Sequence, residues 1–159
     1  MPCGASRDLY HIEAQLYRIC VSRYIVFAKA NISTKGGNSV VQNKNQLREE
    51  SIDFAIAVSD VCDMIHGCSV YVNQLLRCSS SIGANIHEAR YAQSRADFIS
   101  KLEIALKEAS ETDYWLELLF RKKKLTEERY VFLKNSCGMI RRKLIASITT
   151  AKTNSGRHD

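Results

Sequence analysis

The stretch QLLRCSSSIGANIHEA, residues 74–89, places three consecutive serines close to a glycine, between two helical patterns. Small residues of this kind suit a loop that cradles a phosphate, or a helix that another helix approaches closely. A Gly-x-x-x-x-Gly-Lys loop does not occur in the sequence. Apolar and small residues keep the helical period throughout, which favours the close-packed helix. These residues are Val72, Leu75, Leu76, Ser79, Ile82, Gly83 and Ile86.

His87 and Glu88 are the residues of this stretch that could perform acid–base chemistry. Adjacent residues on a helix point about 100° apart, so the two side chains would not reach one substrate. Asn85 and Glu88 are three residues apart and share a face, which favours a structural pair that sets helix register. Arg77 and Arg95 are the expected partners of Glu88. We expect no catalytic residues here, and a structural polar core made of Ser81, Asn85 and Glu88.

Cys62 and His66 lie four residues apart, a spacing that can hold a metal ion on a helix. Asp63 and Cys68 are the nearest further ligands, but a zinc site needs three or four convergent side chains. None of the six cysteines forms a Cys-x-x-Cys pair. We therefore expect buried, reduced cysteines in a cytoplasmic protein, with no metal and no cofactor.

The densest positive charge is the run Arg121–Lys124. It either compensates a helix dipole in a solvated turn or contacts phosphates. A second cluster, residues 141–143, lies roughly 20 Å further along the next predicted helix at 1.5 Å per residue. We expect the two clusters to form a stripe that binds nucleic acid. Its members are Arg121, Lys122, Lys123, Lys124, Arg141, Arg142 and Lys143, with Arg77, Arg90 and Arg95 as secondary contacts.

Long segments without helix breakers must position these residues. The chain has one proline, and its 45% hydrophobic and 25% charged residues are ordinary for a globular protein. The net charge of +6 is uneven, because residues 1–44 carry six Lys or Arg and two acids, whereas residues 45–159 carry seventeen and fifteen. An argument for nucleic acid therefore depends on local clusters. No secretory signal or membrane span is expected.

Four strongly periodic segments predict helices at about residues 46–66, 70–91, 96–122 and 126–152. Short connections between long helices predict an all-α, antiparallel up-down-up-down four-helix bundle over residues 46–152. An N-terminal extension and linker, residues 1–45, precedes it and has helical periodicity at residues 8–30. Residues 34–45 are polar and rich in Gly and Asn, as linkers are. We expect residues 153–159 to be a disordered tail.

The periodic positions also predict which helix faces are apolar. In the third segment they alternate steps of three and four, as in a heptad seam. Its members are Phe98, Leu102, Ala105, Ala109, Thr112, Leu116 and Leu119. In the first segment the predicted face comprises Ile52, Ala55, Ile56, Ser59, Cys62 and Ile65. Ser94 with Asp97 resembles a capping box, Thr126 is a good N-cap, and Trp115 beside the seam could face a neighbouring subunit.

The motifs SIGANIHEA and AQSRADFISKLEIALKEASETDYWLELL, residues 81–89 and 92–119, resemble the four-helix bundle family, also called the 23S rRNA intervening-sequence protein family. The resemblance covers about residues 46–152, and residues 1–44 have no counterpart in it. It implies a small bacterial, non-enzymatic protein that assembles as a homopentamer with a basic surface. One related branch, the accessory variability determinant of diversity-generating retroelements, binds nucleic acid and a reverse transcriptase, which implies such a partner by analogy.

The residues and the resemblance together lead to one hypothesis and one alternative. We expect a non-enzymatic homo-oligomer associated with RNA, or with DNA, through phosphate contacts without base readout. The alternative is an oligomeric scaffold that binds another protein and no nucleic acid. The near-balanced charge of residues 45–159 favours that alternative.

Overall fold

The computed structural model describes residues 39–153, with side chains placed from residue 46 onward. The predicted helix at residues 8–30 and residues 154–159 of the predicted tail lie outside this range. Helices make up most of the described chain, and no strand occurs within it. The helices are α2 (Ser39–Asp63), α3 (Ser69–Ala89), α4 (Arg95–Arg121) and α5 (Glu127–Thr153).

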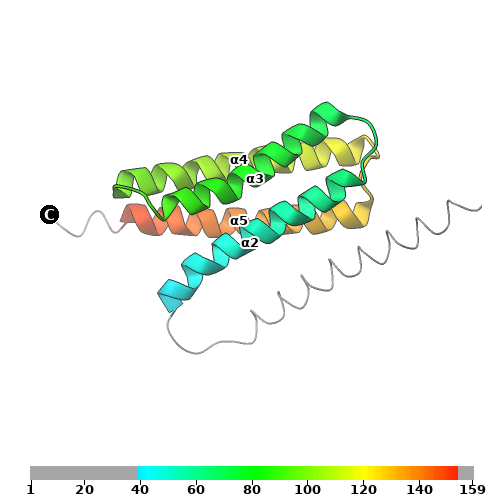
Figure 1. Ribbon diagram of the computed structural model, residues 1–159. Helices are drawn as coiled ribbons and strands as arrows, with labels where there is room; N and C mark the ends of the chain where they lie inside the picture. The colour runs from blue at the N-terminus through cyan, green and yellow to red at the C-terminus, as the bar shows by residue number, and fades with distance from the viewer. Residues whose placement is uncertain (1–38, 154–159) are drawn as a thin grey trace, which may run out of the picture. The chain divides into compact units, whose positions relative to one another are not determined.

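Successive helices run in opposite directions, so the predicted all-α up-down-up-down bundle is confirmed (Figure 1). The connections are residues 64–68, 90–94 and 122–126, and turns this short join neighbouring antiparallel helices. Figure 1 shows α4 and α5 running along one another, with α2 and α3 inclined to them in the same direction.

Polar caps begin α4 and α5 where the sequence predicts them. Ser94 Oγ accepts a hydrogen bond from the Asp97 backbone N–H at 3.1 Å, and the Asp97 carboxylate accepts one from the Gln93 N–H at 3.1 Å. Thr126 Oγ1 accepts from the Arg129 N–H at 3.3 Å. The Ser94 and Thr126 hydroxyls satisfy N–H groups that the first helical turn leaves without an intrahelical partner.

The apolar seam of α4 faces the core, as predicted. Every seam position from Leu102 to Leu119 is buried, and Phe98 is half-buried against the core. On α3, Leu75, Ser79 and Ile82 are fully buried, so the serine-rich stretch is a packed helix rather than a loop.

The apolar face predicted for α2 is wrong by about one residue, or about 100° of helix rotation. Ile52 and Ile56 are 38% and 53% exposed, and of the predicted face Cys62 is the residue that is buried. The buried side comprises Leu47, Ser51, Phe54, Ala57, Val58, Val61 and Cys62. α2 has apolar residues on two faces, and the one that carries the bulky Phe54 packs against the bundle.

The ends of α2 and α5 also differ from the prediction. α2 begins at Ser39, inside the segment predicted to be a linker. Residues 39–66 contain no glycine or proline, so their polar composition does not prevent a helix. Thr153, predicted to start the tail, is the last residue of α5. None of the helices within residues 39–153 is both long and apolar enough to cross a membrane.

Candidate nucleic-acid interface

The basic run Arg121–Lys124 ends α4 and forms the first part of the turn into α5. All four side chains are exposed. The Lys123 and Lys124 backbone N–H groups donate to the Phe120 and Leu119 carbonyls at 2.8 and 2.9 Å, and Lys123 has a left-handed φ of 56°. These bonds close the end of α4, so the turn presents its cations from a defined backbone.

Three of the four cations have a partner within the bundle. Arg121 forms an ion pair with Glu117, one helical turn back on α4. Lys122 Nζ lies 5.5 Å from the centre of the Tyr71 ring, and Lys124 Nζ donates to the His66 carbonyl at 3.0 Å. The Lys123 side chain has no hydrogen bond or ion pair with any described residue. The run therefore stabilises the end of the bundle and still exposes its charge.

The second basic cluster does not point in one direction. Arg141 faces α4, with Nη1 3.8 Å from the Asp113 carboxylate, and Lys143 faces α2, with Nζ 2.6 Å from Glu50 Oε2. Arg142 is exposed. Consecutive helical residues differ by about 100° in direction, so the three cannot line one stripe. Of this cluster, Arg142 is the residue left for an external phosphate.

The secondary cations are also mostly committed to the bundle. Arg77 pairs with Glu108 at 3.3 Å and with Glu111, which joins α3 to α4. Hydrogen bonding to Arg77, and then to the indole of the chain's one tryptophan, lowers the pKa of Glu111. Arg95 Nε donates to the Ala151 carbonyl at 2.7 Å. Arg90 is exposed, and its side chain bonds to no described residue.

The predicted polar core needs correction. Glu88 is exposed and pairs with Lys101 Nζ at 2.6 Å, rather than with either arginine named from the sequence. Asn85 Nδ2 donates to the Ser81 carbonyl at 2.8 Å, and both residues are half-buried. Sequence spacing placed Asn85 and Glu88 on the same face of the helix. It did not show that Glu88, at the edge of this face, is exposed to solvent. The buried polar residues are instead Ser51, Ser79, Thr112 and Ser136.

Each of these buried hydroxyls bonds to the preceding turn of its own helix. Ser79 Oγ donates to the Leu76 carbonyl at 3.2 Å, and Thr112 Oγ1 donates to the Glu108 carbonyl at 2.8 Å. Such bonds let a small polar side chain be buried without losing its hydrogen bond. The serine-rich stretch of α3 is therefore part of helix packing.

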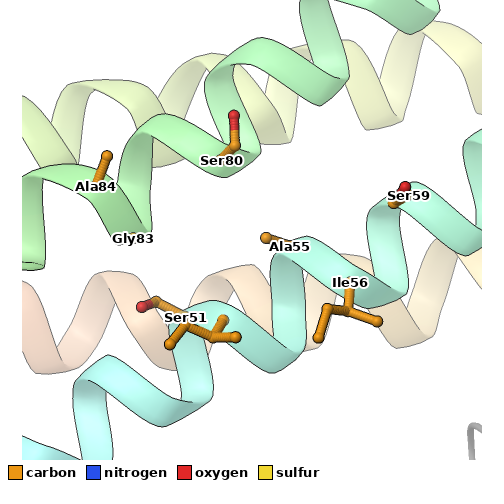
Figure 2. Close-up of a pocket in the computed structure, with 8 residues that line it drawn as sticks. Ser51, Ala55, Ile56, Ser59, Ser80, Gly83 and Ala84 are labelled. Carbon is orange, nitrogen blue, oxygen red and sulfur yellow. The ribbon is translucent and has the colours of Figure 1, made fainter.

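A groove lies beside that packing, between α2 and α3. A Cβ atom on Gly83 would be 3.3 Å from Ser51 Oγ, so the helices come close at this point. The groove has a volume of about 340 Å³ (Figure 2). Figure 2 shows α2 on one side and α3 on the other. The lining residues are Ser51, Ile52, Ala55, Ile56, Ser59, Ser80, Gly83 and Ala84.

The cysteines of the bundle are placed for packing. Cys62, Cys78 and Cys137 are buried, and burial raises the pKa of Cys62 and of Cys137 to about 12. A thiol with such a pKa is protonated at neutral pH and is a poor nucleophile or metal ligand. Within residues 39–153, no group of three His, Cys, Asp or Glu side chains could hold a metal ion.

An aromatic cluster next to the basic turn was not predicted from the sequence. The Tyr71 and Trp115 rings are stacked, with centroids 5.9 Å apart, and Tyr114 meets Trp115 edge-on at 5.0 Å. Tyr71 belongs to α3 and the other two to α4. The signal available in the sequence was the pair Tyr114-Trp115 beside the seam, but Tyr71 joins it only when α3 and α4 pack together.

Fold and site together define an antiparallel four-helix bundle with a basic turn at one end. A family model described as 23S rRNA-intervening sequence protein matches residues 43–146. The chain belongs to this family, in agreement with the resemblance of its α3 and α4 motifs.

Among solved structures, the chain is similar to a protein with unknown function from the S23 ribosomal protein family of Bacteroides thetaiotaomicron. The two are 44% identical in sequence, with a TM-score of 0.64. The match covers 67% of this chain and 98% of that chain. A search of the curated proteins found no match.

Proposed function

We propose that the protein is a non-enzymatic, homo-oligomeric bundle that associates with RNA through phosphate contacts at the α4–α5 turn. The observation that carries this proposal is the exposure of all four cations of the Arg121–Lys124 run at one end of the bundle. Contacts to phosphate supply affinity and position without reading sequence.

Several cations elsewhere in the bundle are paired with acids. Arg77 and Lys143 are matched to acids on facing helices, and Lys101 is matched to Glu88. Paired cations attract phosphates less than unpaired ones, because the neighbouring carboxylate cancels much of their field. Five candidate cations are exposed and have no such acid among the described residues, so they are the most available to a phosphate. They are Lys122, Lys123, Lys124, Arg90 and Arg142.

Two further observations support the non-enzymatic, oligomeric part of the proposal. The thiols of Cys62 and Cys137 are buried and kept protonated, which removes them as nucleophiles. The α2–α3 groove exposes Ile52 and Ile56, an apolar surface of the kind that subunits cover. A pentamer is the state expected from the resemblance, and several copies of a weak basic site would bind one RNA more tightly than a single copy.

The test compares two variants with the same net charge. Lys122→Gln, Lys123→Gln and Lys124→Gln together neutralise the lysines of the turn, whereas Lys101→Gln, Lys107→Gln and Lys152→Gln together neutralise lysines of α4 and α5 outside the turn. Binding of a structured RNA is titrated at several salt concentrations. We expect the turn variant to bind more weakly, with a salt slope that falls by about 0.7–0.9 for each phosphate that the protein no longer neutralises. Equal affinities for the two variants would contradict this site, and no binding by the unmodified protein would contradict the function.

The second candidate function is an oligomeric scaffold for another protein, without nucleic acid. The apolar groove between α2 and α3 favours it, since the pocket is lined mainly by alanine, isoleucine, glycine and serine rather than by cations. Under this hypothesis, neutralising the turn leaves partner binding unchanged, while polar substitutions in the groove abolish it.

A further inference from the structure

A series of side-chain contacts joins the basic turn to the aromatic cluster. Lys122 Nζ lies 5.5 Å from the Tyr71 ring centre. Tyr71 stacks on Trp115 with an interplanar angle of 25°, and Trp115 meets Tyr114 at 74°. These contacts connect Lys122 of the turn, through Tyr71 on α3 and Trp115 on α4, to Tyr114, which is 59% exposed. We call these three rings, Tyr71, Trp115 and Tyr114, the aromatic platform.

Contacts beneath the platform hold it in place. Tyr71 and Trp115 are half-buried against the core. Trp115 Nε1 donates to Glu111 Oε1 at 3.1 Å, and Glu111 is itself paired with Arg77. The indole N–H is thus already satisfied, and the ring cannot turn without breaking this bond. Tyr114 is the exposed member of a cluster whose other two rings are fixed.

The acidic side chains of α4 near the platform form ion pairs within the bundle. Glu108 and Glu111 pair with Arg77, and Glu117 pairs with Arg121. An approaching phosphate therefore meets mainly paired carboxylates on α4 beside Lys122 and Lys123, whereas Glu127 and Glu128 are exposed at the start of α5. An exposed aromatic ring beside unpaired cations is the combination that proteins use to bind single-stranded nucleic acid, with bases stacked and phosphates paired.

We infer that the aromatic platform binds unpaired bases of single-stranded RNA, with a base stacked on Tyr114 and the adjoining phosphates at Lys122 and Lys123. This inference rests on the proposed RNA association and specifies the form of RNA. A base offers its flat face to a side chain when it is unpaired and unstacked, so a duplex cannot use the platform. The duplex still reaches the lysines of the turn through its phosphates.

The experiment uses the full chain, a short oligouridylate and a duplex RNA of the same length. Trp115 is the one tryptophan of the chain, so its fluorescence reports on the platform. We expect oligouridylate to quench that fluorescence, and Tyr114→Ala to weaken oligouridylate binding about 10-fold while changing duplex binding less than about two-fold. Tyr114→Phe keeps the aromatic ring and retains binding.

Tyr91→Ala is the matched control. Tyr91 is the other strongly exposed tyrosine of the described residues, and it lies in the α3–α4 turn at the opposite end of the bundle. Its substitution is expected to leave both affinities unchanged. An equal loss from Tyr91→Ala and Tyr114→Ala would overturn the platform as a specific site.

Three other outcomes overturn the inference in distinguishable ways. If Tyr114→Ala binds oligouridylate as tightly as the unmodified protein does, the platform does not stack bases, while the proposed RNA association stands. If the substitution instead changes the molar mass measured by light scattering, Tyr114 is a subunit contact. If the unmodified protein binds neither RNA, the proposed function fails together with the inference.

Discussion

α4 and α2 differ in how many apolar faces they present. α4 has one seam, which is buried from Leu102 to Leu119 between its neighbours α3 and α5. α2 buries Phe54 and Val58 and leaves Ile52 and Ile56 partly exposed. A helix between two neighbours can bury its whole apolar surface, whereas a helix with a second apolar face keeps surface available for another contact.

α4 and α2 also differ in the polar contacts that connect them to the other helices. α4 is tied to α3 by Arg77 and to α5 by Asp113, which lies within 3.8 Å of both Lys134 and Arg141. α2 is tied to α5 through the pair of Glu50 and Lys143. A side-chain hydrogen bond from Arg48 Nε to His87 Nδ1, at 3.3 Å, connects α2 to α3. The groove forms where α2 and α3 separate beside the close approach at Gly83.

The largest expected effect tests whether α2 is an integral part of the bundle. Phe54→Ala removes a side chain that is 1% exposed, and should lower the free energy of unfolding by about 3–5 kcal/mol because it leaves a cavity. Leu116→Ala on α4 is the matched control, with an expected loss of about 2–5 kcal/mol. Urea unfolding followed by circular dichroism measures both. A large loss for Leu116→Ala with none for Phe54→Ala would show that α2 packs weakly in solution.

A smaller effect tests the close approach of α2 to α3. Gly138→Ala on α5 meets the flexible end of the Arg142 side chain, so it should stabilise the helix by about 1 kcal/mol through higher helix propensity. Gly83→Ala meets the buried Ser51 instead, so crowding should cancel part or all of that gain. The comparison uses the two unfolding midpoints. Equal stabilisation by both substitutions would mean that the helices are further apart at Gly83.

The smallest effect on stability is expected in the groove, where assembly should respond instead. Ile52→Ser with Ile56→Ser alters exposed side chains, and the free energy of unfolding of the bundle should change by less than about 0.5 kcal/mol for each substitution. If subunits cover the groove, the molar mass measured by sedimentation should fall toward that of one chain. Ile145→Ser, at an exposed position of α5, is the control and should leave the mass unchanged. An unchanged mass for the groove variant would exclude this groove as the subunit contact.

Local patterns in the sequence predicted the helices and several of their details. The heptad-like seam of α4, the Ser94 cap and the Thr126 cap depend on residues within one or two turns of each other, and all three are found. The serine-rich part of α3 was predicted correctly because its helical period is uninterrupted. The start of α2 was missed because polar composition was given more weight than the absence of glycine and proline.

Interactions between helices were harder to predict. Glu88 pairs with Lys101 rather than with Arg77 or Arg95, because the α3–α4 turn places Lys101 opposite it. The cluster at residues 141–143 divides among three directions, which a count of basic residues cannot show. These results depend on the rotation of each helix about its axis.

The order of residues along the chain specifies where the helices lie, that they run antiparallel, and that α4 has one apolar seam. Periodicity and short connections are local properties of the sequence. They depend on residues that are close together in the chain, so the packing of the other helices does not change them. Packing selected Phe54 over Ile56 for the core, assigned Arg77 to Glu111, and joined Tyr71 to Trp115. Those choices require several helices to meet, because the free energy of burying one face depends on the surface that covers it.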